Sequence, residues 1–461
     1  MVPQLAELYR EHVARLVGET SKALEDTGWD GLLIHSGRLQ RRSSFDDQDC
    51  PLRVMPAFLH WLPLMVPDCL VVVVPGKRPQ LLHNTAHSYW EGRTVIESEH
   101  FWECFEVFEV SEPAQAKNLI PAVARLAFIG DNAERAAFLG IPKEAINPEA
   151  LLSRLDAVRS VKSPYEVACM SEANRRAAPG YRQVVEAFRA GEHSELELHL
   201  MYLQATRQDD PDTPFKGIVA LGKNAAVLHH VRYGREPSRR QADSLLVDAG
   251  ATCLGYCSDI TRTVVKGNTG GAKAFAALVE GMEKVQRTIR SRIAVGIPFE
   301  DLHDQTHWLI ASLIRELGIA KASEDELVVG GATRKFLPHG LGHSLGIQTH
   351  DVGCLVKSPK PENRFLRNTS ITAAGQVVTI EPGFYFIEEL LGELKAGPIG
   401  DRIAWDLVAE LSLFGGVRIE DDMHVAATST TATTTDGCGG SGSGSGSGGG
   451  GARNLTREHL P

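Results

Sequence analysis

The sequence predicts a mixed α/β (α+β) protein, in which a small N-terminal α/β domain precedes a larger domain built on a curved antiparallel sheet. Three observations lead to this prediction. Continuous apolar runs alternate with helical patterns over residues 1–160, a helix-initiation signal begins at Ser163, and separated strand-like segments follow it. The length of 461 residues fits two domains, since a single core rarely grows beyond about 250–300 residues.

The N-terminal domain is expected to span residues 1–160 and to hold a sheet covered on both faces. Residues 1–27 have the charge pattern of an amphipathic helix rather than that of a signal peptide. The runs 31–34, 70–74 and 126–129 are apolar throughout, as is typical of buried strands between layers of helices.

The second domain is expected to span residues 161–425 and to begin with a long helix. Ser163 can cap this helix, with Pro164 at the first helical position and Glu166 completing a capping box. Further segments follow the helical and strand periods: helices at 272–293 and 300–317, and strands at 245–251, 258–265, 377–380 and 417–425. A curved sheet assembled from these strands would hold a site on its concave face.

The C-terminal part begins with a low-complexity segment. Residues 426–451 pass from Thr/Ser repeats into pure Gly/Ser, which predicts a flexible linker with a reach on the order of 5–6 Å × √n. Residues 452–461 return to ordinary composition and are expected to form a tail that can dock back.

Composition and charge exclude several classes of protein. The formal net charge is −10 and no basic patch stands out, which argues against a nucleic-acid partner. No apolar run reaches the ~18 residues that a membrane span needs. The eight cysteines are scattered, and the Cys253/Cys257 pair lacks a second pair to complete a zinc site, so a reducing cytoplasm is expected.

Two aspartates flank a predicted hairpin. If its turn is centred between Cys253 and Leu254, Asp248 lies directly opposite Asp259, with Cβ atoms about 5 Å apart. Such a pair of anions would repel, and a cation between them would relieve the repulsion. The alternative is that both are surface carboxylates beside a turn, although Asp is depleted inside strands.

A glycine-rich loop over residues 338–351 carries His339, His343 and His350. Glycines allow close backbone approach, so three histidines in such a loop indicate a site, whereas a lone histidine is more often structural. Glu381 and Glu420 each end a β-branched run; either alone could be an exposed strand end. The pair His229-His230 could equally be a bland surface pair.

Together these motifs supply four carboxylates and at least one imidazole. This inventory can hold two divalent cations side by side, and oxygen-rich ligand sets favour hard or borderline ions such as Mn²⁺. Two such ions would generate an activated hydroxide and polarise a carbonyl oxygen. The motifs therefore predict a dinuclear metallohydrolase.

The same motifs resemble those of the pita-bread metallopeptidases, the family of aminopeptidase P, prolidase and methionine aminopeptidase. The matching pieces occur in the family's order: 247–250, 259–263, 339–351, 381–383 and 418–421. Residues 41–47 and 161–166 are similar to bacterial Xaa-Pro dipeptidases, a subgroup that includes enzymes hydrolysing organophosphorus compounds. The long N-terminal domain argues against methionine aminopeptidase, and retention of all ligands argues against creatinase and the metal-free binding relatives.

The resemblance implies a role for each site residue. Asp248, Asp259, His343, Glu381 and Glu420 would be the metal ligands, with His343 chosen because it lies seven residues before the catalytic His350. Glu381 would also shuttle a proton. His339 and Arg418 would face the substrate carboxylate, and His229 would line the pocket. Phe215 stands where relatives often carry Tyr, and Thr349 where Val or Ile is usual, so substrate preference could differ.

The expected function is hydrolysis of Xaa-Pro dipeptides with two divalent ions, Mn²⁺ first and Co²⁺ or Zn²⁺ as alternatives. Aminopeptidase P, acting on longer peptides with proline second, is the near rival, and a non-catalytic peptide-binding module is the remote one. Side activity on organophosphates is a further expectation. Analogy also predicts a homodimer in which Asp46, Asp47 or Trp90 closes the partner's site.

Overall fold

The structure is a computed structural model that describes residues 2–86, 99–237, 243–427 and 451–460. It divides into two compact units, Met1–Ala168 and Cys169–Pro461. The first therefore extends a few residues beyond the domain boundary expected at residue 160. Among the described residues, no helix is long and apolar enough to cross a membrane.

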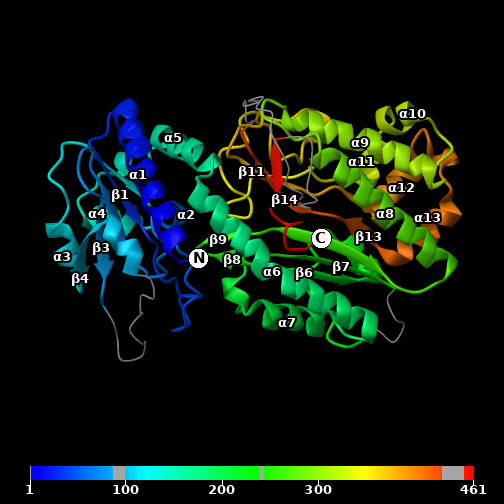
Figure 1. Cartoon of the computed structure of the whole chain (residues 1–461), viewed down its shortest axis with the longest axis horizontal. Helices are drawn as coiled ribbons and strands as arrows, with labels where there is room; N and C mark the ends of the chain where they lie inside the picture. The colour runs from blue at the N-terminus through cyan, green and yellow to red at the C-terminus, as the bar shows by residue number, and fades with distance from the viewer. Residues whose placement is uncertain (1, 87–98, 238–242, 428–450, 461) are drawn as a thin grey trace, which may run out of the picture. The chain divides into compact units, whose positions relative to one another are not determined.

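The first unit is built on a five-stranded mixed sheet in the order β4-β3-β2-β1-β5 (Figure 1). The three predicted apolar runs form its inner strands β1 and β2 and its edge strand β5. Every residue of β1 and β2 is buried, so both faces of these strands are covered, as predicted. The strands are β1 (Gly31–His35), β2 (Leu70–Val73), β3 (Gln80–Asn84), β4 (Glu106–Val110) and β5 (Leu126–Ile129).

Helices cover this sheet. On one face, Leu33, Val72 and Phe128 pack with Ala116 of α3 and Ala136 of α4 in one core cluster. The amphipathic pattern at the N-terminus forms α1, as predicted. The helices of this unit are α1 (Val2–Thr27), α2 (Pro56–Leu59), α3 (Pro113–Asn118), α4 (Ala133–Phe138) and α5 (Glu149–Ser160).

A long helix, α6 (Pro164–Ala190), begins at the predicted capping box. The backbone N–H of Ser163 donates to Glu166 Oε2 at 2.8 Å, and the N–H of Glu166 donates back to Ser163 Oγ at 3.4 Å. Two of the orphan donors of the first turn are thereby satisfied. A second helix, α7 (Glu195–Thr206), begins with the same kind of box at Ser194.

The second unit has its strands between two sets of helices (Figure 1). Tyr181 of α6 and Tyr202 of α7 pack on Val247 in one core cluster, while α8 and α9 pack on Phe384 and Val417 in another. The strands are β6 (Ile218–Leu221), β7 (Ser244–Ala249), β8 (Thr252–Cys253), β9 (Tyr256–Cys257), β10 (Ile260–Val265), β11 (Val377–Ile380), β12 (Gly383–Tyr385), β13 (Gly416–Arg418), β14 (Asp421–Val425) and β15 (Ala452–Asn454). The helices are α8 (Gly270–Arg290), α9 (Phe299–Glu316), α10 (Glu324–Val329), α11 (Ala332–Phe336), α12 (Glu388–Ala396) and α13 (Trp405–Leu411).

These strands form small antiparallel sheets, β10-β7-β6, β11-β14-β15 and β12-β13. The prediction of one strand over 417–425 was wrong, because β13 and β14 belong to different sheets. The N–H of Ile419 donates to the Pro382 carbonyl at 3.3 Å, and that of Glu420 to the Thr261 carbonyl at 3.1 Å. The chain thus passes from one sheet to the next at Glu420.

The C-terminal tail docks back, as expected. Its strand β15 pairs antiparallel with β14, with Met423 opposite Asn454. The linker predicted over residues 426–451 consists almost entirely of residues 428–450, which lie outside the described residues.

Candidate metal centre and active site

Asp248 and Asp259 lie on one face of the β7–β10 pair, but in a different register from the predicted one. Asp248 is opposite Thr261, not Asp259. The turn consists of Leu254 and Gly255, whose φ angles of 52° and 88° are both positive, as in a type I′ hairpin turn. The turn centre therefore lies one residue later than expected. Asp259 is two residues from Thr261, so alternation still directs it to the face of Asp248.

Glu420 reaches this face from between β13 and β14. A β-bridge joins it to Thr261, whose hydroxyl donates to Glu420 Oε2 at 2.7 Å. The same threonine opposes Asp248, so its backbone holds two ligand candidates in fixed relation.

His343 and Glu381 approach from the histidine loop and the end of β11. The loop runs beside β11, where the Thr379 N–H donates to the His343 carbonyl at 2.9 Å. Gly342 permits this approach, because a Cβ there would lie 2.0 Å from the Thr379 carbonyl oxygen. His343 Nε2 lies 3.4 Å from Asp259 Oδ2 and 3.6 Å from Glu381 Oε1.

The second nitrogen of His343 fixes its tautomer. Nδ1 lies 3.0 Å from the Ser344 carbonyl, which can only accept, so the proton sits on Nδ1 and Nε2 keeps its lone pair. This is the usual arrangement of a metal-ligating histidine. One ligand atom each from Asp259, His343 and Glu420 lies within 4.8 Å of the others. Glu381 adjoins this group through His343, and Asp248 is near enough to Asp259 and Glu420 to raise the pKa of both, so the five ligand candidates lie together.

Arg418, His339 and Tyr385 form a hydrogen-bonded group beside the ligands. The Tyr385 hydroxyl lies 2.8 Å from His339 Nε2 and accepts from Arg418 at 2.8 Å. Arg418 is buried and also donates to Asp248 Oδ2 at 2.5 Å and to Thr261 Oγ1 at 3.1 Å. Sequence reasoning missed Tyr385, although it lies two residues after the Glu381-Pro382-Gly383 motif. Gly383 makes room for its ring, since a Cβ there would lie 2.4 Å from the hydroxyl.

His350 lies next to His343, with ring centroids 4.5 Å apart and the planes nearly perpendicular. The Arg367 guanidinium contacts His350 Nδ1. A guanidinium only donates, so Nδ1 accepts and the proton of a neutral His350 sits on Nε2. Burial, helped by the charges of His343 and Arg367, lowers the pKa of His350 to about 3, which keeps it neutral. No sequence signal marked Arg367, an isolated residue in an irregular loop.

The remaining predicted residues lie at the periphery. His229 is exposed, and its charge lowers the pKa of both His339 and His350, which places it near the two. Phe215 is half-buried three residues before Ile218, the partner of Asp248 in the β6–β7 pair. Asp46 and Asp47 belong to the first unit, and Trp90 lies outside the described residues.

Comparison with known proteins identifies the family to which this chain belongs. The family model described as "Metallopeptidase family M24" matches residues 168–427, and "Xaa-Pro dipeptidase, N-terminal domain" matches residues 7–156. The chain belongs to metallopeptidase family M24. The M24 match covers all five ligand candidates, together with His339, His350 and Arg418.

Relatives of the M24 chain match over nearly its whole length. An Xaa-Pro dipeptidase of Pseudoalteromonas atlantica is 38% identical over 433 residues, which are 92% of this chain and 96% of the relative. One of Yersinia enterocolitica is 38% identical over 432 residues, 91% of this chain and 96% of the relative. Aminopeptidase P from E. coli, solved with the inhibitor Pro-Leu, superposes with a TM-score of 0.71 at 21% identity and covers 98% of this chain and 95% of its own. This confirms the fold prediction.

The electrostatics of the M24 site fit a pair of divalent cations. Burial and the neighbouring carboxylates hold the pKa of Asp259 and of Glu420 well above the usual range, and burial raises the pKa of Glu381 to about 7. Asp248 Oδ1 is buried with no hydrogen-bond partner. Acidic oxygens gathered at this density repel one another, and bound cations would remove the repulsion. The donor set of four carboxylates and one imidazole matches that need.

Two further aspartates, Asp421 and Asp422, make hydrogen bonds next to the ligand candidates Glu420 and Asp259. Asp421 accepts from Arg262 at 2.8 Å, from Arg290 at 3.1 Å and from Arg457 of the tail at 2.9 Å; although burial opposes it, these arginines hold the Asp421 pKa well below its usual range. Asp422 Oδ2 accepts from the Asp259 N–H at 3.2 Å and from Asn174 at 2.8 Å. Its own N–H donates to Thr456 of the tail at 2.9 Å. The docked tail thus contributes to holding Glu420 and Asp259.

Proposed function

We propose that this chain is an Xaa-Pro dipeptidase that uses two divalent metal ions. The observation that carries the proposal is the convergence of all five ligands in a chain that is up to 38% identical to Xaa-Pro dipeptidases over about nine-tenths of its length. Aminopeptidase P is the second candidate, because solved structures of that enzyme share the fold.

Asp248, Asp259, His343, Glu381 and Glu420 would hold the two ions. Bound there, they would lower the pKa of water toward neutrality and polarise the scissile carbonyl. Manganese is proposed first because four carboxylates and one imidazole form a hard, oxygen-rich set, with Co²⁺ and Zn²⁺ as alternatives.

Glu381 is proposed to accept the proton of the attacking water and to return it to the proline nitrogen. This nitrogen belongs to a tertiary amide and must be protonated to leave. Glu381 Oε1 lies 3.6 Å from His343 Nε2, and its Oε2 lies 3.7 Å from His339 Nδ1, so the carboxyl group sits between a proposed metal ligand and a residue proposed to bind substrate. A carboxylate in that position is suited to accept and return the proton.

His350 is proposed to stabilise the developing oxyanion. Arg367 occupies its Nδ1, so the Nε2–H is the donor available for substrate, and neutral imidazole keeps that proton. Removal of one such preorganised donor typically costs ~10²–10³ in rate.

His339 and Arg418 are proposed to recognise the free carboxylate of the dipeptide. Arg418 reaches it as part of the Tyr385 hydrogen-bonded group. Arg367 adds a second, exposed cation next to His350. Two guanidinium groups near the reacting centre would favour substrates that end at proline, since planar guanidinium pairs bidentately with carboxylate. His229 and Phe215 would line the pocket.

Three further proposals concern the cellular location, the oligomeric state and a side activity of the chain. A cytoplasmic location is proposed because Cys69, Cys257 and Cys354 are buried as free thiols, which a reducing compartment preserves. A homodimer, in which Asp46 or Asp47 helps to close the partner's site, is proposed by analogy with the fold. Slow hydrolysis of organophosphates is a further proposal, since the same ions would polarise a phosphoryl oxygen.

The test compares three substrates on metal-stripped protein with and without Mn²⁺. Leu-Pro should be cleaved only with metal, whereas Leu-Pro-amide and a Leu-Pro-Xaa tripeptide should be cleaved poorly. Efficient cleavage of the tripeptide would move the assignment to aminopeptidase P. Cleavage of none of the three, with metal demonstrably bound, would overturn the prolyl-peptide assignment.

A further inference from the structure

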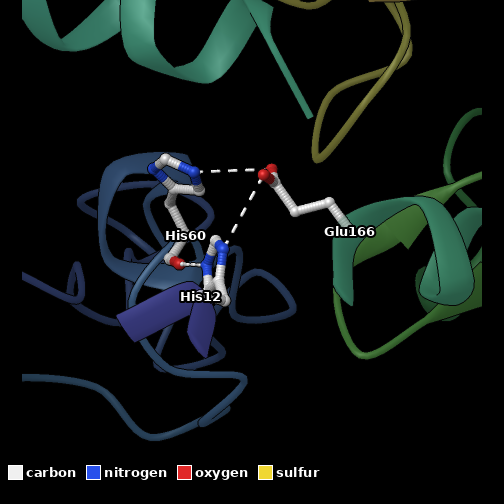
Figure 2. A group of neighbouring side chains, drawn as sticks. All are labelled: His12, His60 and Glu166. Atoms are coloured by element: carbon white, nitrogen blue, oxygen red, sulfur yellow. Dashed lines mark hydrogen bonds and ion pairs between the residues drawn. The ribbon is translucent and has the colours of Figure 1, made fainter. Parts of the chain in front are cut away.

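A second cluster of metal-ligating side chains lies in the first unit, apart from the five M24 ligands (Figure 2). His12 is on α1, His60 directly follows α2, and Glu166 is in the first turn of α6. Their exposed fractions are 1%, 6% and 1%. The fold therefore buries three side chains that carry potential ligand atoms, and these come from distant parts of the sequence.

The distances within the cluster suit one small cation. His60 Nε2 lies 3.4 Å from Glu166 Oε1, and His12 Nδ1 lies 3.7 Å from Glu166 Oε2. One ligand atom from each of the three residues lies within 4.8 Å of the others. Ligands bound tetrahedrally to Zn²⁺ at about 2.0–2.2 Å are roughly 3.3–3.5 Å apart. The two histidine–carboxylate distances are close to that spacing, with each ring facing a different oxygen of Glu166.

The tautomer of His12 leaves a lone pair facing the cluster. His12 Nε2 lies 2.8 Å from the His60 carbonyl, which can only accept, so His12 carries its proton on Nε2 and directs the Nδ1 lone pair inward. The Ser163 hydroxyl is 2.9 Å from this Nδ1. His60 Nε2 is buried and faces Glu166 Oε1 at 3.4 Å. A histidine whose outer N–H bonds a backbone carbonyl is the usual form of a metal ligand.

The charge states also suit coordination. Burial lowers the pKa of His12 to about 4 and lowers that of His60, so both rings are neutral near pH 7. Burial opposes ionisation of Glu166, but His60, His12 and Lys162 hold its pKa well below the usual range. The set is thus two neutral imidazoles and one carboxylate, the ionisation states that metal binding requires.

Neighbouring cations restrict which ion this cluster can take. Arg15 Nη1 lies 3.5 Å from Glu166 Oε2, and its Nη2 is already bonded to the carbonyls of Val158 and Val161. Lys162 donates to the Arg159 carbonyl at 2.6 Å. These charges disfavour an ion held mainly by electrostatic attraction to a carboxylate. An ion with high affinity for imidazole is less affected, and Zn²⁺ exceeds Mn²⁺ in that respect.

We propose that His12, His60 and Glu166 form a third metal site, which binds one Zn²⁺-like divalent cation and is separate from the catalytic pair. Ser163 or a water molecule would fill the fourth position. The site is closed against solvent, so its role is structural: the ion would link α1, the segment after α2 and the start of α6. Binding at this site is selective for Zn²⁺ or Co²⁺ over Mn²⁺.

The test measures bound metal per full-length chain after equilibrium dialysis. Wild-type protein should hold three Zn²⁺ but two Mn²⁺. His60→Gln should hold two Zn²⁺ and keep its Mn²⁺-dependent Leu-Pro hydrolysis. The matched control His83→Gln, also in the first unit, should keep three. Two Zn²⁺ in wild-type protein, or three in His60→Gln, would overturn the proposal.

A second variant tests the site without any change to the cluster and without reliance on activity. Asp259→Ala with His343→Ala removes ligands of the catalytic pair. This protein should still bind one Co²⁺ with the intense visible absorption of a tetrahedral imidazole site. Loss of that absorption would contradict the third site, even if His60→Gln failed to fold. A failure of the dipeptidase proposal would leave both metal measurements unchanged.

Discussion

The guanidinium of Arg418 donates to Oδ2 of Asp248 over 2.5 Å, so the residue proposed to face substrate is bonded to a proposed metal ligand. Both are buried, and Thr261 lies between them, as the residue opposite Asp248 and a hydrogen-bond partner of Arg418. Substitutions among the residues proposed to bind substrate are therefore expected to alter metal affinity. Substitutions of the proposed metal ligands are expected to alter substrate binding.

Tyr385→Phe tests this connection with the smallest change. It removes the hydroxyl that joins His339 to Arg418 and leaves the ring packing intact. Two hydrogen bonds worth about 0.5–1.5 kcal/mol each are lost, so kcat/KM for Leu-Pro should fall roughly tenfold. Tyr9→Phe is the matched control, because it removes a buried hydroxyl that bonds the Trp61 carbonyl in the first unit. Equal kinetic losses in the two variants would refute a role for Tyr385 at the site.

Glu381→Gln tests the proton shuttle. The amide keeps the shape of the side chain and an oxygen for the metal but cannot accept a proton. We expect kcat to fall by at least ~10²–10⁴, with an unchanged circular-dichroism spectrum and melting temperature. Normal turnover in this variant would contradict the assignment of Glu381.

Arg457→Leu tests whether the C-terminal tail holds Glu420 and the start of β14 in place. Arg457 pairs with Asp421, the residue after Glu420, and with Glu283 at 2.8 Å. Loss of such an outer partner typically costs 10–100-fold in metal affinity, so the Mn²⁺ concentration for half-maximal activity should rise about tenfold. Arg453→Leu, which breaks only an exposed pair with Glu458, should leave that concentration unchanged. An identical response of both variants would refute the tail's role.

His303 predicts acid sensitivity of the fold. Burial lowers its pKa to about 4 from an ordinary value of 6.5. The His303 imidazole is therefore protonated below about pH 6.5 in the unfolded chain but only below about pH 4 in the folded chain. The free energy of unfolding contributed here is present above pH 6.5 and lost as the pH falls toward 4, by roughly 3 kcal/mol at most. Urea unfolding at pH 7, 6 and 5 measures the free energy of unfolding. That free energy should fall less steeply with decreasing pH in His303→Gln than in wild-type protein. The same dependence on pH in both proteins would contradict the prediction.

The sequence allowed local features with strong chemistry to be predicted. The Ser163–Glu166 box, the buried runs of β1, β2 and β5, and the five proposed ligands all have residue types that few other environments tolerate. The hairpin register was missed because it depends on Leu254 adopting a positive φ, which sequence does not indicate for a γ-branched residue.

Other features depend on tertiary contacts alone. The break at Glu420 comes from a bridge to Thr261, and the role of Arg367 from its proximity to His350. Likewise, His12, His60 and Glu166 are separated by 48 and more positions, so no spacing motif marks them. His12 and His60 carry no pattern in the sequence that would distinguish them from surface residues, and the capping box explains Glu166 without reference to a metal.

The most direct test of the central claim is a stoichiometric titration of metal-stripped protein with Mn²⁺, scored by proline release from Leu-Pro. The five converging ligands predict that activity rises from near zero and levels off at two equivalents per chain. A plateau at one equivalent, or hydrolysis that is independent of added metal, would contradict a dinuclear centre.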